Sequence, residues 1–137
     1  MSPEVEQASF QIIASVGAAR SNYVEAIHRA KEGDFDGAEQ LIAEGQQLFT
    51  AGHDAHFSLI QKEAAGEQSE FALILMHAED QLMSAEAFGI LAKEFISVYQ
   101  AIARNRTHEH RRNTGLSVPC HVRRHGARLP AGEAWHA

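Results

Sequence analysis

The chain has 137 residues, of which 45% are hydrophobic and 22% charged, with three prolines and the single cysteine Cys120. This composition is typical of one globular domain and excludes fibrous, disordered and disulfide-rich proteins. No apolar run approaches the length of about eighteen residues that a membrane helix needs, and the N-terminus lacks the pattern of a signal peptide. We therefore expect a cytoplasmic protein.

The net charge of −6 is unevenly distributed along the chain. Residues 1–102 contain five basic and sixteen acidic side chains, whereas residues 103–137 contain seven arginines against Glu109 and Glu133. An acidic body disfavours nucleic-acid binding, which needs a basic surface. We expect neither a nucleic-acid partner nor insertion into a membrane.

A first helix is predicted from Pro3 to the stop at Gly33. Ser2 is a suitable N-cap, Pro3 fits the first helical position, and the acidic Glu4 and Glu6 favour a helix N-terminus. Its apolar stripe at helical spacing consists of Val5, Ile12, Val16, Ala19, Tyr23, Ala26 and Ala30.

A second helix is predicted to start near Asp34 and Asp36 and to end near Gly66, and Ser69 can cap a third that continues past Tyr99. Each helix is long, about 30 residues or 45 Å, and the connections are short. Short connections force neighbouring helices to run antiparallel. The predicted fold class is therefore all-α, an up-down-up three-helix bundle.

The third predicted helix is apolar on two opposite sides. One stripe contains Phe71, Ile74, Leu75, Ala78, Leu82, Ala85, Gly89, Ala92, Ile96 and Tyr99. The opposite stripe contains Leu73, Met76, Met83, Ala87 and Leu91. Three helices cannot cover both stripes, and a helix that is apolar nearly all round is buried nearly all round. We therefore expect an oligomer whose axis runs along this helix.

Beyond residue 102 the helical pattern weakens. Residues 103–137 contain arginines and five histidines without a sustained period. We interpret residues 1–102 as the functional domain and 103–137 as a basic tail, disordered or derived from cloning, with an RNA- or membrane-binding arm as the weaker alternative.

His77 and Asp80 are the residues of the third helix that could carry chemistry. They are three apart and therefore share one side of the helix. From spacing alone, His77 is more often an unreactive half-buried histidine. Asp80 falls within the second apolar stripe, where an oligomer would bring its copies together. A shared proton or a hard divalent cation such as Mg²⁺ would relieve their repulsion.

His53, Asp54 and His56 form a second candidate cluster, on the second helix. The two histidines are three apart and could bind zinc or a similar metal. The spacing differs from the His-Glu-x-x-His motif, so this is a minor hypothesis.

The segment from Leu75 to Ser84, Leu-Met-His-Ala-Glu-Asp-Gln-Leu-Met-Ser, resembles the active-site helix of the lactose/cellobiose-type IIA proteins of the bacterial sugar phosphotransferase system. That family's pattern there is close to Val-His-Ala-Gln-Asp-His-Leu-Met-Thr. Residues 11–20, 30–35 and 59–67 also resemble the family, in the same order, so that the resemblance covers about 6–100 and omits the tail.

The resemblance implies a trimer of three-helix subunits packed around the third helix. It implies that His77 is the phosphorylated residue, through a tele-phosphohistidine, and that Asp80 is the metal-associated acid on the trimer axis, with Mg²⁺ or another divalent cation. The implied donor is the carrier HPr, and the implied acceptor is a cysteine of a IIB component that serves uptake of lactose, cellobiose or chitobiose.

Two residues depart from the family pattern. Gln81 replaces the usual histidine, and it can still offer a hydrogen bond to a phosphoryl oxygen or to His77 as a supporting residue. Glu79 replaces a frequent glutamine and adds negative charge near the phosphate, although it points toward the polar strip. The alternative hypothesis is a non-catalytic oligomeric helical scaffold.

Overall fold

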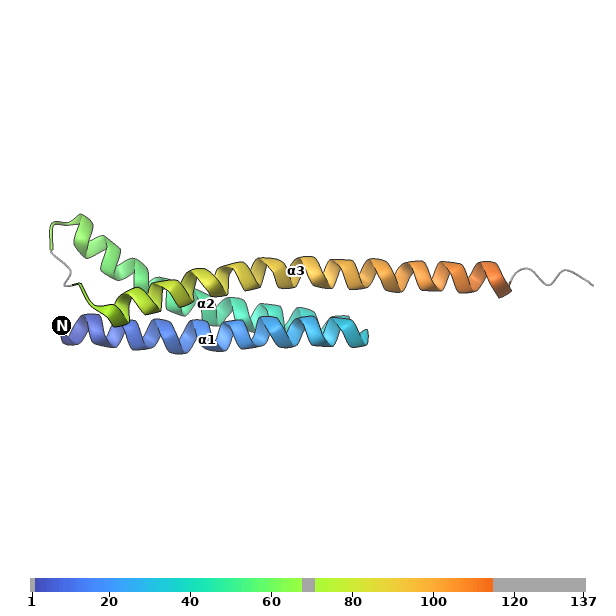
Figure 1. Ribbon diagram of the computed structural model, residues 1–137, viewed down its shortest axis with the longest axis horizontal. Helices are drawn as coiled ribbons and strands as arrows, with labels where there is room; N and C mark the ends of the chain where they lie inside the picture. Colours follow the sequence, from blue (N-terminus) through green and yellow to red (C-terminus); the bar gives the residue numbers. More distant parts are fainter. Residues whose placement is uncertain (1, 68–70, 115–137) are drawn as a thin grey trace, which may run out of the picture.

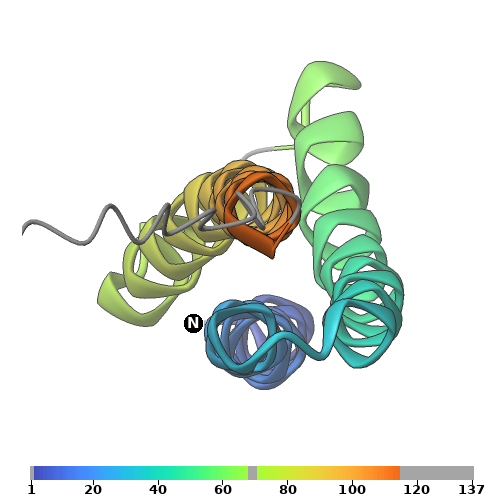
Figure 2. The ribbon, with the colours of Figure 1, turned by 90° about the vertical axis from the view of Figure 1, so that its right-hand side faces the viewer.

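Three long helices make up the structure, a computed structural model that describes residues 2–67 and 71–114. They are α1 (Pro3–Glu32), α2 (Phe35–Ala64) and α3 (Leu73–Thr114). Each runs antiparallel to the one before it (Figure 1), and the end-on view shows them at the corners of a triangle (Figure 2). The prediction of an all-α, up-down-up three-helix bundle is confirmed.

The predicted ends of α1 and the start of α2 are confirmed at the level of single hydrogen bonds. Ser2 Oγ accepts from the Val5 backbone N–H at 3.3 Å, which caps the first turn of α1. Gly33 ends α1 with a φ of 89°, a left-handed conformation that glycine adopts without steric cost. Asp34 then caps α2 by accepting from the Gly37 N–H at 3.0 Å.

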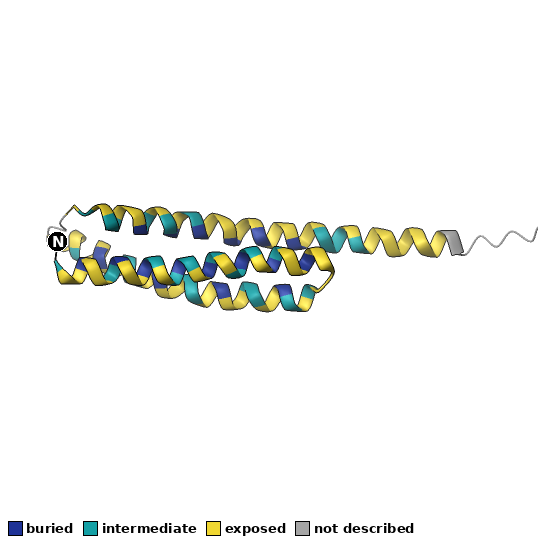
Figure 3. Ribbon diagram, turned by 60° about the horizontal axis from the view of Figure 1, so that its bottom comes forward, coloured by how far each residue is buried: buried dark blue, intermediate teal, exposed yellow. Residues whose placement is uncertain are grey.

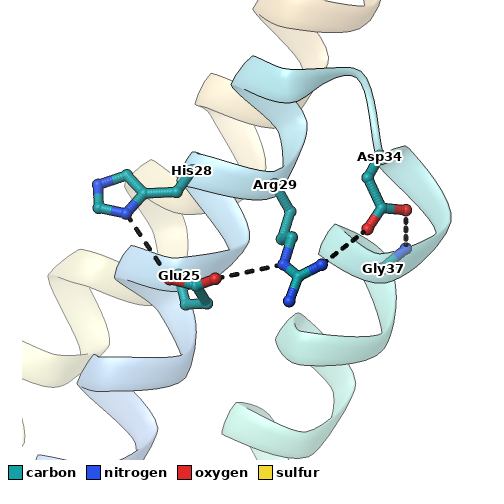
Figure 4. Close-up of polar contacts among 5 residues, drawn as sticks. All are labelled: Glu25, His28, Arg29, Asp34 and Gly37. Atoms are coloured by element: carbon teal, nitrogen blue, oxygen red, sulfur yellow. Dashed lines mark hydrogen bonds and ion pairs between the residues drawn. The ribbon is translucent and has the colours of Figure 1, made fainter.

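Charged side chains join the two helices across this turn (Figure 4). The Arg29 guanidinium lies 3.2 Å from a Glu25 carboxylate oxygen and 3.5 Å from an Asp34 oxygen. His28 also contacts Glu25, at 3.7 Å. Because all of these groups are exposed, the contacts orient the turn more than they stabilise the fold.

The core contains the predicted stripe of α1 in full. Each of those residues is buried, together with Ser9. Opposite them lie buried residues of α2 and α3: Ala38, Leu59, Ala78, Leu82, Ala85, Ala92 and Ile96. Small residues predominate on α3 in this list, so the helix axes approach closely.

The second apolar side of α3 is exposed, as the sequence predicted for a single subunit (Figure 3). We call this surface the outer face of α3. It consists of Leu73, Met76, Asp80, Met83, Ala87, Leu91 and Val98, all of which are exposed. An exposed apolar patch of this length marks an interaction site.

Two sequence expectations about α3 differ from the structure. Phe71 belongs to the predicted buried stripe but is 84% exposed, because α3 begins only at Leu73 and helical spacing does not extend to Phe71. At the other end α3 continues to Thr114, past the boundary at residue 103. Ser69 as the cap of this helix, and residues 115–137 of the expected tail, lie outside the described residues.

Within the described part of the chain, no helix is both long and apolar enough to cross a membrane.

Candidate functional site

His77 lies in the second turn of α3 with its side chain exposed. It borders a shallow hollow that runs along the outer face, lined by Leu73, Met76, His77, Glu79, Asp80 and Met83. The imidazole is therefore accessible to another protein while its backbone is held in a rigid helix. This combination suits a residue that must meet a macromolecular partner in a defined orientation.

Gln81 follows His77 by one turn on the side of α3 that faces α1. Its carboxamide oxygen accepts a hydrogen bond from Arg20 Nη1 of α1 at 2.9 Å. Residues four apart are neighbours on a helix surface, so His77, Gln81 and Arg20 follow one another along one flank. Sequence reasoning identified Gln81 but assigned no role to Arg20, because nothing in the spacing of one helix shows what a second helix brings to it.

Glu79 lies on the opposite flank, about 200° around the helix from His77. One of its carboxylate oxygens is 3.2 Å from Nε2 of His56, a mostly buried histidine of α2. Glu79 nevertheless lines the same hollow as His77, so the expectation that it adds negative charge near the phosphate stays a prediction. Its contact with His56 also connects α3 to α2.

Asp80 lies on the outer face, close to His77 in sequence. It is exposed and, among the residues the structure describes, forms no hydrogen bond or ion pair. Within the same residues of one chain, no group of three or more histidine, cysteine or acidic side chains is arranged to hold a metal ion. The described part of one subunit thus offers a divalent cation fewer than three such ligands around Asp80, and further ligands would have to come from other copies.

His53 and His56 engage different partners. The His53 ring stacks on Phe57 with centroids 6.3 Å apart and lies 6.2 Å from the ring of Phe49. Its Nδ1 is 3.9 Å from an Asp54 oxygen. His56 turns to α3. The structure does not bring these two histidines together as a pair of ligands.

The sequence of this chain is similar to that of a known protein family. A profile of the family described as the lactose/cellobiose-specific IIA subunit of the PTS system matches residues 7–100. The oligo-β-mannoside-specific EIIA component of Bacillus subtilis strain 168 is 46% identical over 95 residues, which are 69% of this chain and 86% of that protein.

Two solved structures have a similar fold. The crystal structure of the cellobiose-specific enzyme IIA from Bacillus anthracis matches with a TM-score of 0.73 and 36% identity, over 76% of this chain and 95% of that one. The solution structure of the chitobiose IIA protein in complex with HPr matches with a TM-score of 0.66 and 25% identity, over 74% of this chain and 99% of that one. The matched region ends near residue 100, well before the end of α3.

Proposed function

The chain belongs to the lactose/cellobiose-specific IIA subunits of the sugar phosphotransferase system, and we propose that it performs their phosphocarrier role by accepting a phosphoryl group on His77. The observation that carries this assignment is an exposed imidazole on a rigid helix, inside the segment that the family profile matches. His53 is also exposed within that segment, but its ring is stacked on aromatic neighbours.

The reaction needs a neutral imidazole with a free lone pair. His77 Nε2 attacks the phosphorus of a phosphohistidine on the donor. The new N–P bond forms as the donor's N–P bond breaks, and the electron pair of that bond returns to the donor imidazole. In the second step a thiolate attacks the same phosphorus, and His77 regains its lone pair. Positioning and electrostatics supply most of the catalysis, because the chain contributes little other covalent chemistry.

Two partner proteins are proposed, one that donates the phosphoryl group and one that accepts it. We propose HPr as the donor, supported by the complex of the chitobiose IIA protein with HPr. We propose a cysteine of a cytoplasmic IIB component as the acceptor, for uptake of a sugar of the lactose, cellobiose or chitobiose type. The accessible hollow beside His77 supports a site at which two such proteins dock in turn.

We also propose that the chain assembles as a homotrimer around α3. The support is the exposed outer face, which a single subunit leaves in water at a cost of about 25 cal/mol for each Å² of apolar surface. Three copies of Asp80 would then face one another on the axis. Carboxylate oxygens are suitable ligands for Mg²⁺ or another hard divalent cation. A bound cation would neutralise their mutual repulsion.

Phosphorylation of the purified chain tests the main assignment. We expect incubation with phosphoenolpyruvate and the general phosphotransfer proteins to add the mass of one phosphate, and His77→Ala to abolish this gain. Because His77 is exposed, the variant should change the free energy of unfolding by less than about 0.5 kcal/mol. The control is His53→Ala, another exposed histidine, which should be phosphorylated normally.

The alternative of a non-catalytic scaffold predicts no phosphorylation of the wild-type chain. That result would refute the proposed function, and so would undiminished phosphorylation of His77→Ala. Phosphorylation that His53→Ala removes, while His77→Ala keeps it, would place the carrier residue on α2 instead.

A further inference from the structure

We propose that Arg20 of α1 binds the phosphoryl group carried by His77, with Gln81 holding the guanidinium in place. This inference rests on the proposed function and adds a phosphate-binding residue from a second helix. Its effect would be to stabilise the phosphorylated form of the chain.

The geometry places Arg20 on the correct flank of α3. Arg20 is half-buried, and its Nη1 donates to Gln81 Oε1 at 2.9 Å, which links two residues 61 positions apart in the sequence. In a helix each Cα–Cβ bond tilts toward the N-terminus. The side chains of Gln81 and His77 tilt in the same direction, so Gln81 holds the guanidinium about one helical turn from the imidazole.

The charge of Arg20 is not compensated by a neighbouring acid. Within residues 2–67 and 71–114 it forms no ion pair, and its one hydrogen-bond partner is a neutral carboxamide. The other basic residues that bind across helices have acidic partners: Arg29 lies between Glu25 and Asp34, and Lys62 contacts Glu4. A half-buried cation held by a neutral acceptor favours a nearby anion.

A phosphoryl group on His77 is such an anion. It carries about −1.5 to −2 charges at neutral pH, by analogy with other phosphorylated side chains. Guanidinium is planar with five N–H donors and matches phosphate oxygens with two parallel hydrogen bonds. One donor of Arg20 is occupied by Gln81, and the others have no partner among the described residues, which leaves them available to phosphoryl oxygens.

The proposal gives a reason for Gln81 at a position where the family usually has histidine. A carboxamide oxygen accepts from arginine at every pH, whereas a protonated imidazole would repel it. Gln81 therefore brings the positive charge to the phosphate indirectly, through Arg20. Arg20 takes no part in bond making: the N–P bond at His77 forms as the donor's bond breaks, and Arg20 stabilises the product.

Two substitutions at Arg20 test this role. Arg20→Gln removes the charge, and we expect the equilibrium constant for phosphate transfer from phospho-HPr to fall about tenfold, the loss of one charge-assisted hydrogen bond. The second pKa of the phosphoryl group, followed by phosphorus NMR on the isolated phosphorylated chain, should rise, because a nearby cation favours the dianion. Arg20→Lys should restore much of both.

The matched control is Arg29→Gln, which removes a paired arginine from the same helix and should leave the equilibrium constant and the phosphoryl pKa unchanged. If Arg20→Gln fails to fold by circular dichroism, Gln81→Leu gives the same test, because it releases Arg20 and should shift both quantities in the same direction by less. If the variant that folds has the same equilibrium constant and the same phosphoryl pKa as the wild-type chain, the proposal is wrong. Failure of the wild-type chain to be phosphorylated at all would instead refute the proposed function.

Discussion

Tyr23 of α1 packs against both of the other helices. Its ring is buried between two glycines: a Cβ added to Gly45 of α2 would lie 2.6 Å from Tyr23 Cε1, and one added to Gly89 of α3 would lie 3.0 Å from Cε2. A methyl group at Gly45 would clash with the ring, and one at Gly89 would fit only if the ring shifted by a few tenths of an ångström. The two glycines therefore allow a large aromatic ring to fill the space between helices that would otherwise be held apart.

Gly45→Ala should destabilise the protein in spite of alanine's higher helix propensity. The propensity gain is about 1 kcal/mol, whereas overpacking a rigid site costs about 1–3 kcal/mol, so we expect a net loss of about 1 kcal/mol. Gly17→Ala is the control. A Cβ there meets nothing within 4 Å, so only the gain of about 0.5–1 kcal/mol remains. Urea unfolding at one protein concentration measures the free energy of unfolding of both variants. Equal stabilisation by Gly45→Ala and Gly17→Ala would contradict the packing argument.

Tyr23 also makes the free energy of unfolding depend on pH in the alkaline range. Burial raises the pKa of its hydroxyl above the usual value of 10.0, because the apolar surroundings disfavour the phenolate. The folded state then holds its proton at a pH where the unfolded chain loses it. Stability from this group is complete below pH 10 and is lost as the pH rises through the folded-state pKa. Tyr23→Phe should show a shallower decline in the free energy of unfolding above pH 10, and parallel profiles would contradict this origin.

At the scale of the helices, the sequence predicted most of what the structure shows. Periodicity identified the buried stripe of α1 without error, and cap residues located the start of α1, its end at Gly33 and the start of α2. These features are determined by residues that are close to one another in the sequence. The exposed second side of α3 was predicted for the same reason.

Features that depend on pairing between helices were not predicted. The Arg20–Gln81 hydrogen bond and the contact of His56 with Glu79 join residues from different helices. Periodicity says which side of a helix is apolar, but not which polar residue of a neighbour reaches it. The continuation of α3 to Thr114 was not predicted, because exposed polar residues can continue a helix without any apolar period.

At the scale of the whole molecule, and without a bound divalent cation, Asp80 should oppose the trimer assembly that the apolar outer face favours. In the proposed trimer, Asp80→Leu removes three facing carboxylates and adds apolar surface, so the trimer should resist dilution better than the wild type in light scattering. Asp54→Leu, at an exposed position on α2, is the control and should leave the mass unchanged. Dissociation of Asp80→Leu into monomers at neutral pH would show that Asp80 holds the assembly together.

The length of α3 implies that its C-terminal end unfolds locally while the bundle stays folded. Residues 107–112 are exposed (Figure 3), and this last part of α3 extends beyond the turn between α1 and α2 (Figure 1). A helical end without packing unfolds and refolds on its own, because its backbone hydrogen bonds alone do not hold it. Deuterium should therefore enter the amides after residue 106 within seconds, while those between Ala78 and Ile96 remain protected, a sharp step within one continuous helix.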